Sequence, residues 1–209
     1  MYRYKIEELK KWKKSKDRKP LIIRGARQVG KTWLMKEFGK QEYQQVAYIN
    51  FDDNERMNQL FSGDFDIERI IQGLKIESGV NIEAENTLII FDEIQETPKA
   101  VTALKYFCEK ANEYNIVAAG SLLGVAMHEG TSFPVGKVDF LDLYPLNFFE
   151  FLEALGEKKL VELIKNNDID LINVFSDKLK QYLKQYMYIG GMPEIVDSYV
   201  QNKDFGEVR

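Results

Sequence analysis

The chain has 209 residues, which is enough for one good-sized domain, or for one domain and part of another. Hydrophobic residues make up 44% of it and aromatic residues 12%, which excludes a disordered protein because such chains lack the apolar surface to offset ordering entropy. One cysteine, Cys108, excludes an intramolecular disulfide framework. No apolar run approaches the about 20 residues that span a bilayer, and the N-terminus lacks a signal-peptide core. We therefore expect a soluble, cytoplasmic protein without a membrane partner.

Charge is unevenly distributed along the chain. Residues 1–31 hold twelve Lys or Arg and three Asp or Glu, a net charge of +9, whereas residues 32–209 carry −13. A basic segment of this kind indicates a nucleic-acid arm or a membrane-surface helix. The acidic remainder argues against a protein that coats nucleic acid in general, so DNA contact through the basic segment stays a hypothesis.

The apolar pattern predicts alternating helices and strands. Ile6, Leu9 and Trp12 recur at helical spacing among lysines, which predicts an amphipathic helix over about residues 4–15. Short, continuous apolar runs between helical stretches predict a parallel sheet covered on both faces, and hence an α/β fold. The expected strands are 21–23, 46–51, 87–92, 115–120 and 138–143, and the further expected helices are 31–38, 65–77 and 98–113.

The pattern of apolar residues changes near Pro145. Beyond it, apolar residues recur every three or four positions and the strand pattern is lost, which predicts a helical extension. We expect residues 1–145 to form an α/β domain and residues 146–209 to begin a helical second part.

A glycine-rich motif lies between the first predicted strand and the following helix. The segment from Gly25 to Thr32 fits G-x-x-x-x-G-K-[ST], in the strand-to-helix context that this phosphate-binding loop requires. Its glycines let the backbone approach a phosphate chain, and successive N–H groups point at the anion. Lys31 is expected to reach the β- and γ-phosphates, and the Thr32 hydroxyl to coordinate Mg²⁺. The alternative is a merely flexible glycine loop. The expected nucleotide-binding residues are Gly25, Arg27, Gln28, Val29, Gly30, Lys31, Thr32 and Trp33.

An apolar strand ending in two carboxylates supplies the second half of such a site. Asp92 is expected to hold Mg²⁺, and Glu93 to orient or deprotonate an attacking water. The alternative is a buried strand that runs out into a solvated acidic turn. Ser121, after the next strand, is a candidate sensor of the γ-phosphate, with the cap of the next helix as its alternative role.

Other aromatic and basic residues near the motif are open to two interpretations. Trp33 is expected to pack against the sheet. Arg27 either contacts a phosphate or a neighbouring subunit, or else points to solvent or pairs with an acid. In the acidic part of the chain, the only candidates for an arginine finger are Arg56 and Arg69.

Longer segments resemble a known family. They are LIIRGARQVGKT, LIIFDEIQ, AAGSLLG, FPVGKVDFLDLYPLNFFEFL and YIGGMPEIV. The sequence resembles prokaryotic AAA-type ATPases in which the AAA domain is followed by a DUF4143 domain, and the last two segments are the discriminating ones. The resemblance implies a five-stranded parallel sheet in the order 5-1-4-3-2 that binds ATP and Mg²⁺. It also implies that the chain stops before the C-terminal region that is usual in the family.

The function expected from these residues is slow ATP hydrolysis. Lys31 and the loop amides would stabilise charge while Glu93 activates water. The alternative is a nucleotide-gated switch that binds ATP or ADP and turns over negligibly alone. A small-molecule kinase fits less well, because the Asp-Glu pair suits water activation better than acceptor binding. The expected partners are ATP or ADP, further copies of the chain, and DNA or a protein bound through the C-terminal region.

Overall fold

The computed structural model describes residues 2–120 and 134–203. The chain divides into two compact units. The sheet unit consists of Lys5–Arg27 and Lys31–Leu143, and the helical unit consists of Met1–Tyr4, Gln28–Gly30 and Tyr144–Arg209. The predicted domain boundary at residue 145 stays a prediction.

The sheet unit contains a five-stranded sheet in the order β2-β3-β4-β1-β5, and all four neighbouring pairs are parallel. This is the predicted order 5-1-4-3-2 counted from the opposite edge, so the predicted fold class is confirmed. The central strands β3 and β4 are buried at every position, as expected where helices cover both faces. The strands are β1 (Leu21–Arg24), β2 (Gln45–Asn50), β3 (Thr87–Asp92), β4 (Asn115–Gly120) and β5 (Asp139–Asp142).

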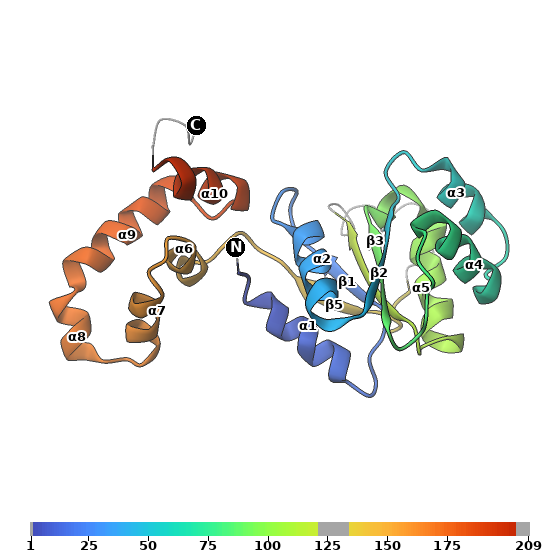
Figure 1. The fold of residues 1–209 in the computed structure, drawn as a ribbon, viewed down its shortest axis with the longest axis horizontal. Coiled ribbons are helices and arrows are strands. Elements are labelled where there is room, and N and C mark those ends of the chain that lie inside the picture. The colour runs from blue at the N-terminus through green and yellow to red at the C-terminus, as the bar shows by residue number, and fades with distance from the viewer. Residues whose placement is uncertain (1, 121–133, 204–209) are drawn as a thin grey trace. The chain divides into compact units, whose positions relative to one another are not determined.

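Helices α1 and α2 lie on one side of the sheet and α3, α4 and α5 on the other (Figure 1). The larger core lies on the α3–α5 side, where the rings of Phe51, Phe61 and Phe91 meet edge-on or tilted at centroid distances of 5.3 to 6.1 Å. The helices are α1 (Lys5–Lys14), α2 (Lys31–Glu42), α3 (Glu55–Ser62), α4 (Ile67–Ser78) and α5 (Pro98–Lys110), with a short 3₁₀ turn, η1 (Ile94–Glu96).

Two local features differ from the sequence expectations. Helix α3 was not predicted, because eight residues give too short a window for helical periodicity; its Asn54 cap accepts the Met57 amide. The expectation that Trp33 packs against the sheet is wrong: Trp33 is 41% exposed, since α2 turns Leu34 and Met35 inward instead. The predicted amphipathic helix is present as α1, with Ile6 and Leu9 of its apolar face buried and Trp12 half-buried.

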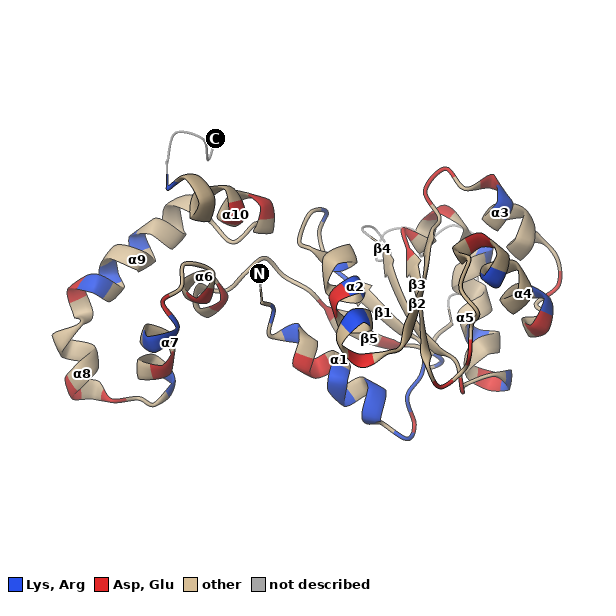
Figure 2. Ribbon diagram, viewed as in Figure 1, with Lys and Arg blue, Asp and Glu red and all other residues tan. Residues whose placement is uncertain are grey.

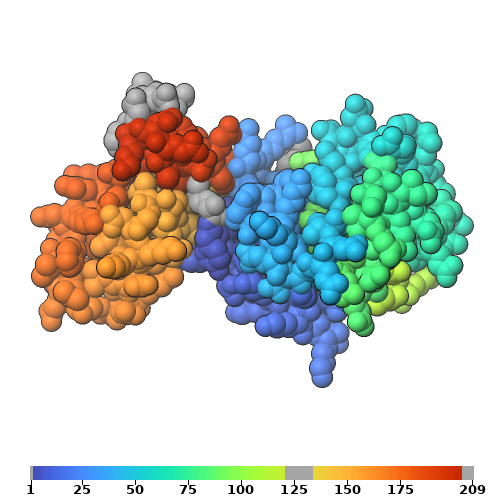
Figure 3. All heavy atoms as spheres, viewed as in Figure 1, coloured from blue at the N-terminus to red at the C-terminus, as the bar shows by residue number. Residues whose placement is uncertain are grey.

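The helical unit contains five helices in its described part, so the predicted helical extension is confirmed. In this unit α6 contacts α7, α9 and α10, and Figure 3 shows these C-terminal helices from yellow-orange to red. Helix α6 begins with a reciprocal cap: Asn147 accepts the amide of Glu150, and Glu150 accepts the amide of Asn147. The helices are α6 (Phe148–Ala154), α7 (Lys158–Lys165), α8 (Ile169–Val174), α9 (Ser176–Ile189) and α10 (Pro193–Asn202).

Within residues 2–120 and 134–203, every helix is too short or too polar to cross a membrane.

Candidate functional site

The glycine-rich loop leaves β1 and enters α2, the strand-to-helix context that its sequence predicts. Two of its residues have positive φ, Gln28 at 63° and Gly30 at 92°. Glycine adopts such angles at no steric cost, whereas Gln28 does so only because the surrounding loop imposes it. Lys31, at the first position of α2, follows directly, so the loop brings backbone amides to a helix N-terminus, where anions bind.

The Lys31 side chain closes back over this loop. Lys31 is only 6% exposed, and its Nζ donates to Gly25 O at 3.0 Å and to Ala26 O at 2.7 Å. Burial lowers the pKa of Lys31, while the nearby Glu93 and Asp92 carboxylates act in the opposite direction. A phosphate oxygen is a better acceptor for this ammonium than a neutral carbonyl, so the arrangement fits an anion held within the loop.

The acidic end of β3 lies against the start of α2. Thr32 Oγ1 donates to Asp92 Oδ2 over 2.6 Å, which brings together the two predicted metal-binding residues. Asp92 is 4% exposed, and its other carboxylate oxygen accepts the Glu93 amide at 3.2 Å. Hydroxyl and carboxylate oxygens are the donors that Mg²⁺ prefers.

Tyr48 was not predicted as a site residue. Its hydroxyl donates to Asp92 Oδ2 over 3.0 Å, so this one oxygen accepts from two hydroxyl groups. Burial, with the Asp92 charge, raises the pKa of Tyr48, so the phenol keeps its proton and remains a donor. The sequence signal was weak, because it depends on which strand lies beside β3.

Glu93 has a left-handed backbone conformation, with φ at 52°. Such a conformation costs of the order of 1–3 kcal/mol in a non-glycine residue and is often found at functional sites. Its Oε2 accepts from Gln95 Nε2 at 2.6 Å. The predicted proton acceptor is therefore fixed by a strained backbone and by an amide hydrogen bond.

The other predicted site residues differ in how far they are exposed to solvent. Arg27 is exposed beside the exposed Gln28, whereas Val29 is buried. Within the helical unit, Val29 O accepts from Arg3 Nη1 at 2.8 Å, a contact that the sequence did not reveal. Ser121 lies outside the described residues.

Three other arginines pair with carboxylates inside the sheet unit. Arg24 donates twice to Asp142, at 2.8 and 3.0 Å, so its counter-charge is a neighbouring strand end rather than a nucleotide. Arg56 pairs with Glu77 at 2.9 Å, and Arg69 with Asp64 at 2.8 Å; these are the two finger candidates.

A phosphate-bound Mg²⁺ fits the donor set of the site. Among the described residues there is no group of three or more His, Cys, Asp or Glu that could hold a metal ion by protein ligands alone. Mg²⁺ is usually bound through one or two carboxylates together with substrate phosphates. Thr32 and Asp92 match that pattern.

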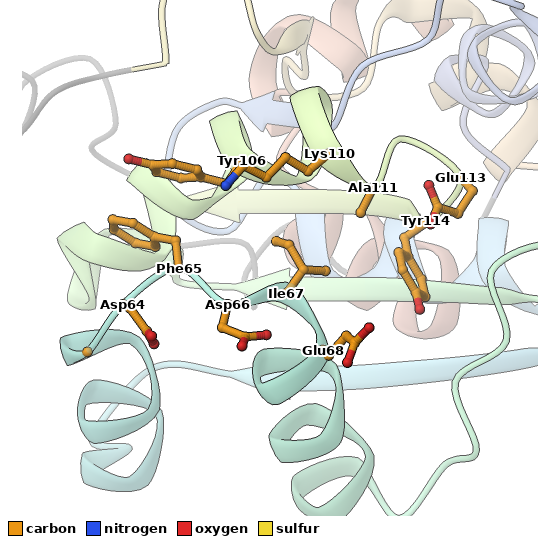
Figure 4. A pocket seen from close by; sticks show the side chains of 11 residues that line it. Asp64, Phe65, Asp66, Ile67, Glu68, Tyr106, Lys110, Ala111, Glu113 and Tyr114 are labelled. Carbon is orange, nitrogen blue, oxygen red and sulfur yellow. The ribbon is translucent and has the colours of Figure 1, made fainter.

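A separate hollow of about 920 Å³ lies between the start of α4 and the end of α5 (Figure 4). The stacked rings of Phe65 and Tyr106, 4.4 Å apart, lie at one end, and Asp66 and Glu68 lie along the α4 side. None of the predicted site residues lines it, so it is distinct from the glycine-rich loop.

The parallel sheet and its glycine-rich loop define a P-loop nucleoside-triphosphatase fold. More specifically, the chain belongs to the AAA_14 family, described as an AAA domain, whose match spans residues 17–152. It is 25% identical to the uncharacterized protein MJ1637 of Methanocaldococcus jannaschii, over 90% of this chain and 41% of that protein. The chain therefore spans less than half the length of this curated relative.

Solved structures are similar at low sequence identity. Drosophila ORC bound to DNA has a TM-score of 0.48 at 15% identity, over 93% of this chain and 53% of that one. AMPPCP-bound DnaA from Aquifex aeolicus has a TM-score of 0.45 at 16% identity, over 88% and 65%. C. elegans PCH-2 has a TM-score of 0.40 at 16% identity, over 69% and 40%.

Proposed function

We propose that the chain binds ATP with Mg²⁺ at its P-loop and hydrolyses it slowly by attack of water. The observation that carries the proposal is the 2.6 Å hydrogen bond from Thr32 Oγ1 to Asp92 Oδ2, which joins the start of α2 to the acidic end of β3. Membership of an AAA family supports nucleotide binding. Residues 1–145 would form the ATPase core and residues 146–209 its helical extension.

Each side chain has a role that follows from its chemistry. Lys31 and the loop amides would offset the charge of the phosphates, and Thr32 and Asp92 would hold Mg²⁺, which would supply further positive charge to them. Glu93 accepts a proton from the attacking water, and Ser121 senses the γ-phosphate. The remaining residues proposed to contact the nucleotide are Gly25, Arg27, Gln28, Val29, Gly30 and Trp33.

Phosphate release from Glu93→Gln tests the hydrolytic role. General-base catalysis contributes about 10²–10⁴-fold, so we expect a fall of about 100-fold or more with nucleotide binding retained. Glu85→Gln, an exposed substitution in the same unit, should match the wild type. Equal rates of release from Glu93→Gln and the wild type would contradict the assignment.

A second candidate function is a nucleotide-gated switch with negligible turnover. The ion pairs of Arg56 with Glu77 and of Arg69 with Asp64 favour it, because both finger candidates are engaged within the same unit. An arginine finger contributes about 10³–10⁵-fold to turnover, so its lack leaves hydrolysis slow. Single-turnover kinetics distinguish the two functions: retention of intact ATP for hours would favour the switch.

Partners follow from the same proposals. A second copy of the chain would be a partner if its Arg56 or Arg69 left the ion pair to act in trans, and DNA or a protein would bind through a DUF4143 region of the kind that the resemblance implies. Exposed lysines of α1 and of the turn after it would contact DNA in the cytoplasm, although Glu7 and Glu8 lie among them (Figure 2). Reversing the charge of Lys11, Lys14 and Lys16, which are exposed, should abolish a salt-dependent DNA shift. No shift of the wild type at low salt would end this proposal.

A further inference from the structure

Tyr48 and Asp92 lie on neighbouring parallel strands. In the register of β2 and β3, Tyr48 is opposite Ile90 and Asn50 is opposite Asp92. Residues two apart in a strand point to the same face, so Tyr48 and Asp92 share one face as diagonal neighbours. An aromatic side chain can span that diagonal, which explains how a residue of β2 reaches the acidic end of β3.

The Tyr48 side chain has contacts at its hydroxyl group and at one face of its ring. Its hydroxyl donates to Asp92 Oδ2 over 3.0 Å, and Lys36 Nζ lies 3.7 Å from the centre of its ring. Lys36 is one helical turn beyond Thr32 on α2. The ring is therefore fixed between the helix that follows the P-loop and the strand that carries Asp92.

Among the described residues, three hydrogen bonds fix the Asp92 carboxylate. Oδ1 accepts the Glu93 amide, while Oδ2 accepts the hydroxyls of Thr32 and Tyr48. A hydroxyl that donates its proton keeps its oxygen lone pairs, so Thr32 can hold Asp92 and still offer oxygen to a metal ion. Tyr48 is the one donor of the three without a role in the proposed chemistry.

We propose that Tyr48 is a positioning residue for a divalent-metal site, and that its hydroxyl keeps the Asp92 carboxylate in the orientation that receives Mg²⁺. This inference rests on the proposed function, because it assumes that Asp92 faces a metal ion. Groups that orient a metal ligand typically change metal affinity or activity by about 10–100-fold when they are removed. The structure assigns that task to a strand that contains no part of the nucleotide-binding motifs.

Tyr48→Phe tests the inference, since it removes the hydroxyl and keeps the ring on Lys36. The readout is Mn²⁺ binding to the protein with ADP, followed by electron paramagnetic resonance, which needs no turnover. We expect the Mn²⁺ affinity to fall about 10-fold. ADP affinity measured with EDTA and turnover at saturating Mg²⁺ should stay within about 2-fold of the wild type, because the hydroxyl acts only through Asp92.

The chain offers a matched control in Tyr43→Phe. The Tyr43 hydroxyl is buried without a hydrogen-bond partner among the described residues, so its loss should leave Mn²⁺ affinity unchanged. In an Asp92→Asn background, adding Tyr48→Phe should have no further effect on Mn²⁺ affinity, because the two residues act through one contact.

Three results would overturn the inference. If the wild type binds Mn²⁺ with ADP and Tyr48→Phe binds it with the same affinity, the positioning role is contradicted. The proposed function is not affected by that result. If Tyr48→Phe lowers the metal-free ADP affinity as much as the Mn²⁺ affinity, and also lowers the melting temperature, Tyr48 has a packing role instead. A wild-type protein that binds no Mn²⁺ in the presence of ADP overturns the metal site and the proposed function together.

Discussion

Each of the two units holds a buried carboxylate, and the partners of the two carboxylates differ. Asp92 in the sheet unit and Glu150 in the helical unit are both 4% exposed. Glu150 Oε1 accepts from Arg3 Nε at 3.1 Å and from the Tyr4 amide at 2.8 Å, so it has a buried cation beside it. The hydrogen bonds that Asp92 makes within the described residues come from two hydroxyls and an amide, all neutral.

The difference separates a structural charge from one that is available for binding. A buried charge is tolerated only if it is paired or well hydrogen-bonded. Glu150 is neutralised by Arg3, which also donates to Val29 O and Tyr144 O. Within the described residues Asp92 accepts hydrogen bonds from neutral groups, and the cation that acts on it from nearby is Lys31, a residue of the same candidate site. Burial alone therefore does not mark the site, whereas the kind of hydrogen-bond donor does: a cation for Glu150, neutral groups for Asp92.

The largest expected effect is on the Arg3–Glu150 pair. Arg3→Met leaves Glu150 as a buried charge without its cation, which should lower the free energy of unfolding by about 3–5 kcal/mol. Urea unfolding measures it. The double variant Arg3→Met with Glu150→Leu should recover part of the loss, because no charge is then left unpaired, although the backbone groups that the two side chains bind lose their partners. A loss below about 1 kcal/mol in the single variant would contradict the structural role.

Asp92→Asn should lower activity rather than stability, which is the opposite of the effect expected for Arg3→Met. We expect metal-dependent phosphate release to fall about 100-fold, or ~2.7 kcal/mol in the activation barrier, because the amide no longer neutralises Mg²⁺. The melting temperature should stay or rise, since a buried charge is removed. Glu150→Gln, the matched change in the helical unit, should lower it. A melting temperature that falls equally in both variants would erase the distinction between the two carboxylates.

A smaller effect is expected from the protonation of Lys31. Only its ammonium form attracts phosphate, and burial lowers its pKa below the 10.5 of an unperturbed lysine. ADP affinity should therefore fall about tenfold per pH unit once the pH exceeds this lowered pKa. Titration of fluorescent ADP from about pH 7 to pH 11 measures it, with circular dichroism as the folding control. Lys31→Arg keeps its proton and should show no such decline.

The smallest effect is expected at a half-exposed pair in the sheet unit. Arg24 and Asp142 side chains are 42% and 44% exposed, and the guanidinium lies 4.3 Å from the centre of the Phe140 ring. Arg24→Lys should cost no more than about 1 kcal/mol, and less at high salt. Urea unfolding at two salt concentrations tests this. A loss above about 2 kcal/mol that is independent of salt would show that this charge is structural too.

Features that depend on consecutive residues could be predicted from the sequence. The apolar run before Asp92 predicts a buried strand, and the loop from Gly25 to Thr32 carries its spacing in eight adjacent positions. The proximity of Thr32 to Asp92 also follows, because both motifs belong at the carboxyl edge of one parallel sheet. The fold and the centre of the candidate site were therefore accessible without coordinates.

Features that depend on pairs of residues far apart in the sequence could not be predicted. Arg3 was one of twelve positive charges in a basic segment and Glu150 one acidic residue within an aromatic run, yet they pair across 147 positions. Tyr48 needed the register of β2 against β3 before its hydroxyl could be placed. A buried ion pair and a diagonal cross-strand contact leave no local pattern, since periodicity reports only which face a residue occupies.

The double glycine at the end of α9 has a consequence for how this sequence can diverge. Gly190 has φ 79° and ψ −169°, a backbone region essentially closed to other residues. Gly191 has a different constraint: its carbonyl accepts the Leu146 amide at 2.7 Å, and a Cβ there would overlap the Leu146 carbonyl oxygen. Two independent requirements thus act on adjacent codons. Across relatives that keep this turn, we expect both positions to remain glycine while the surrounding helices drift, so that the dipeptide outlasts the overall similarity.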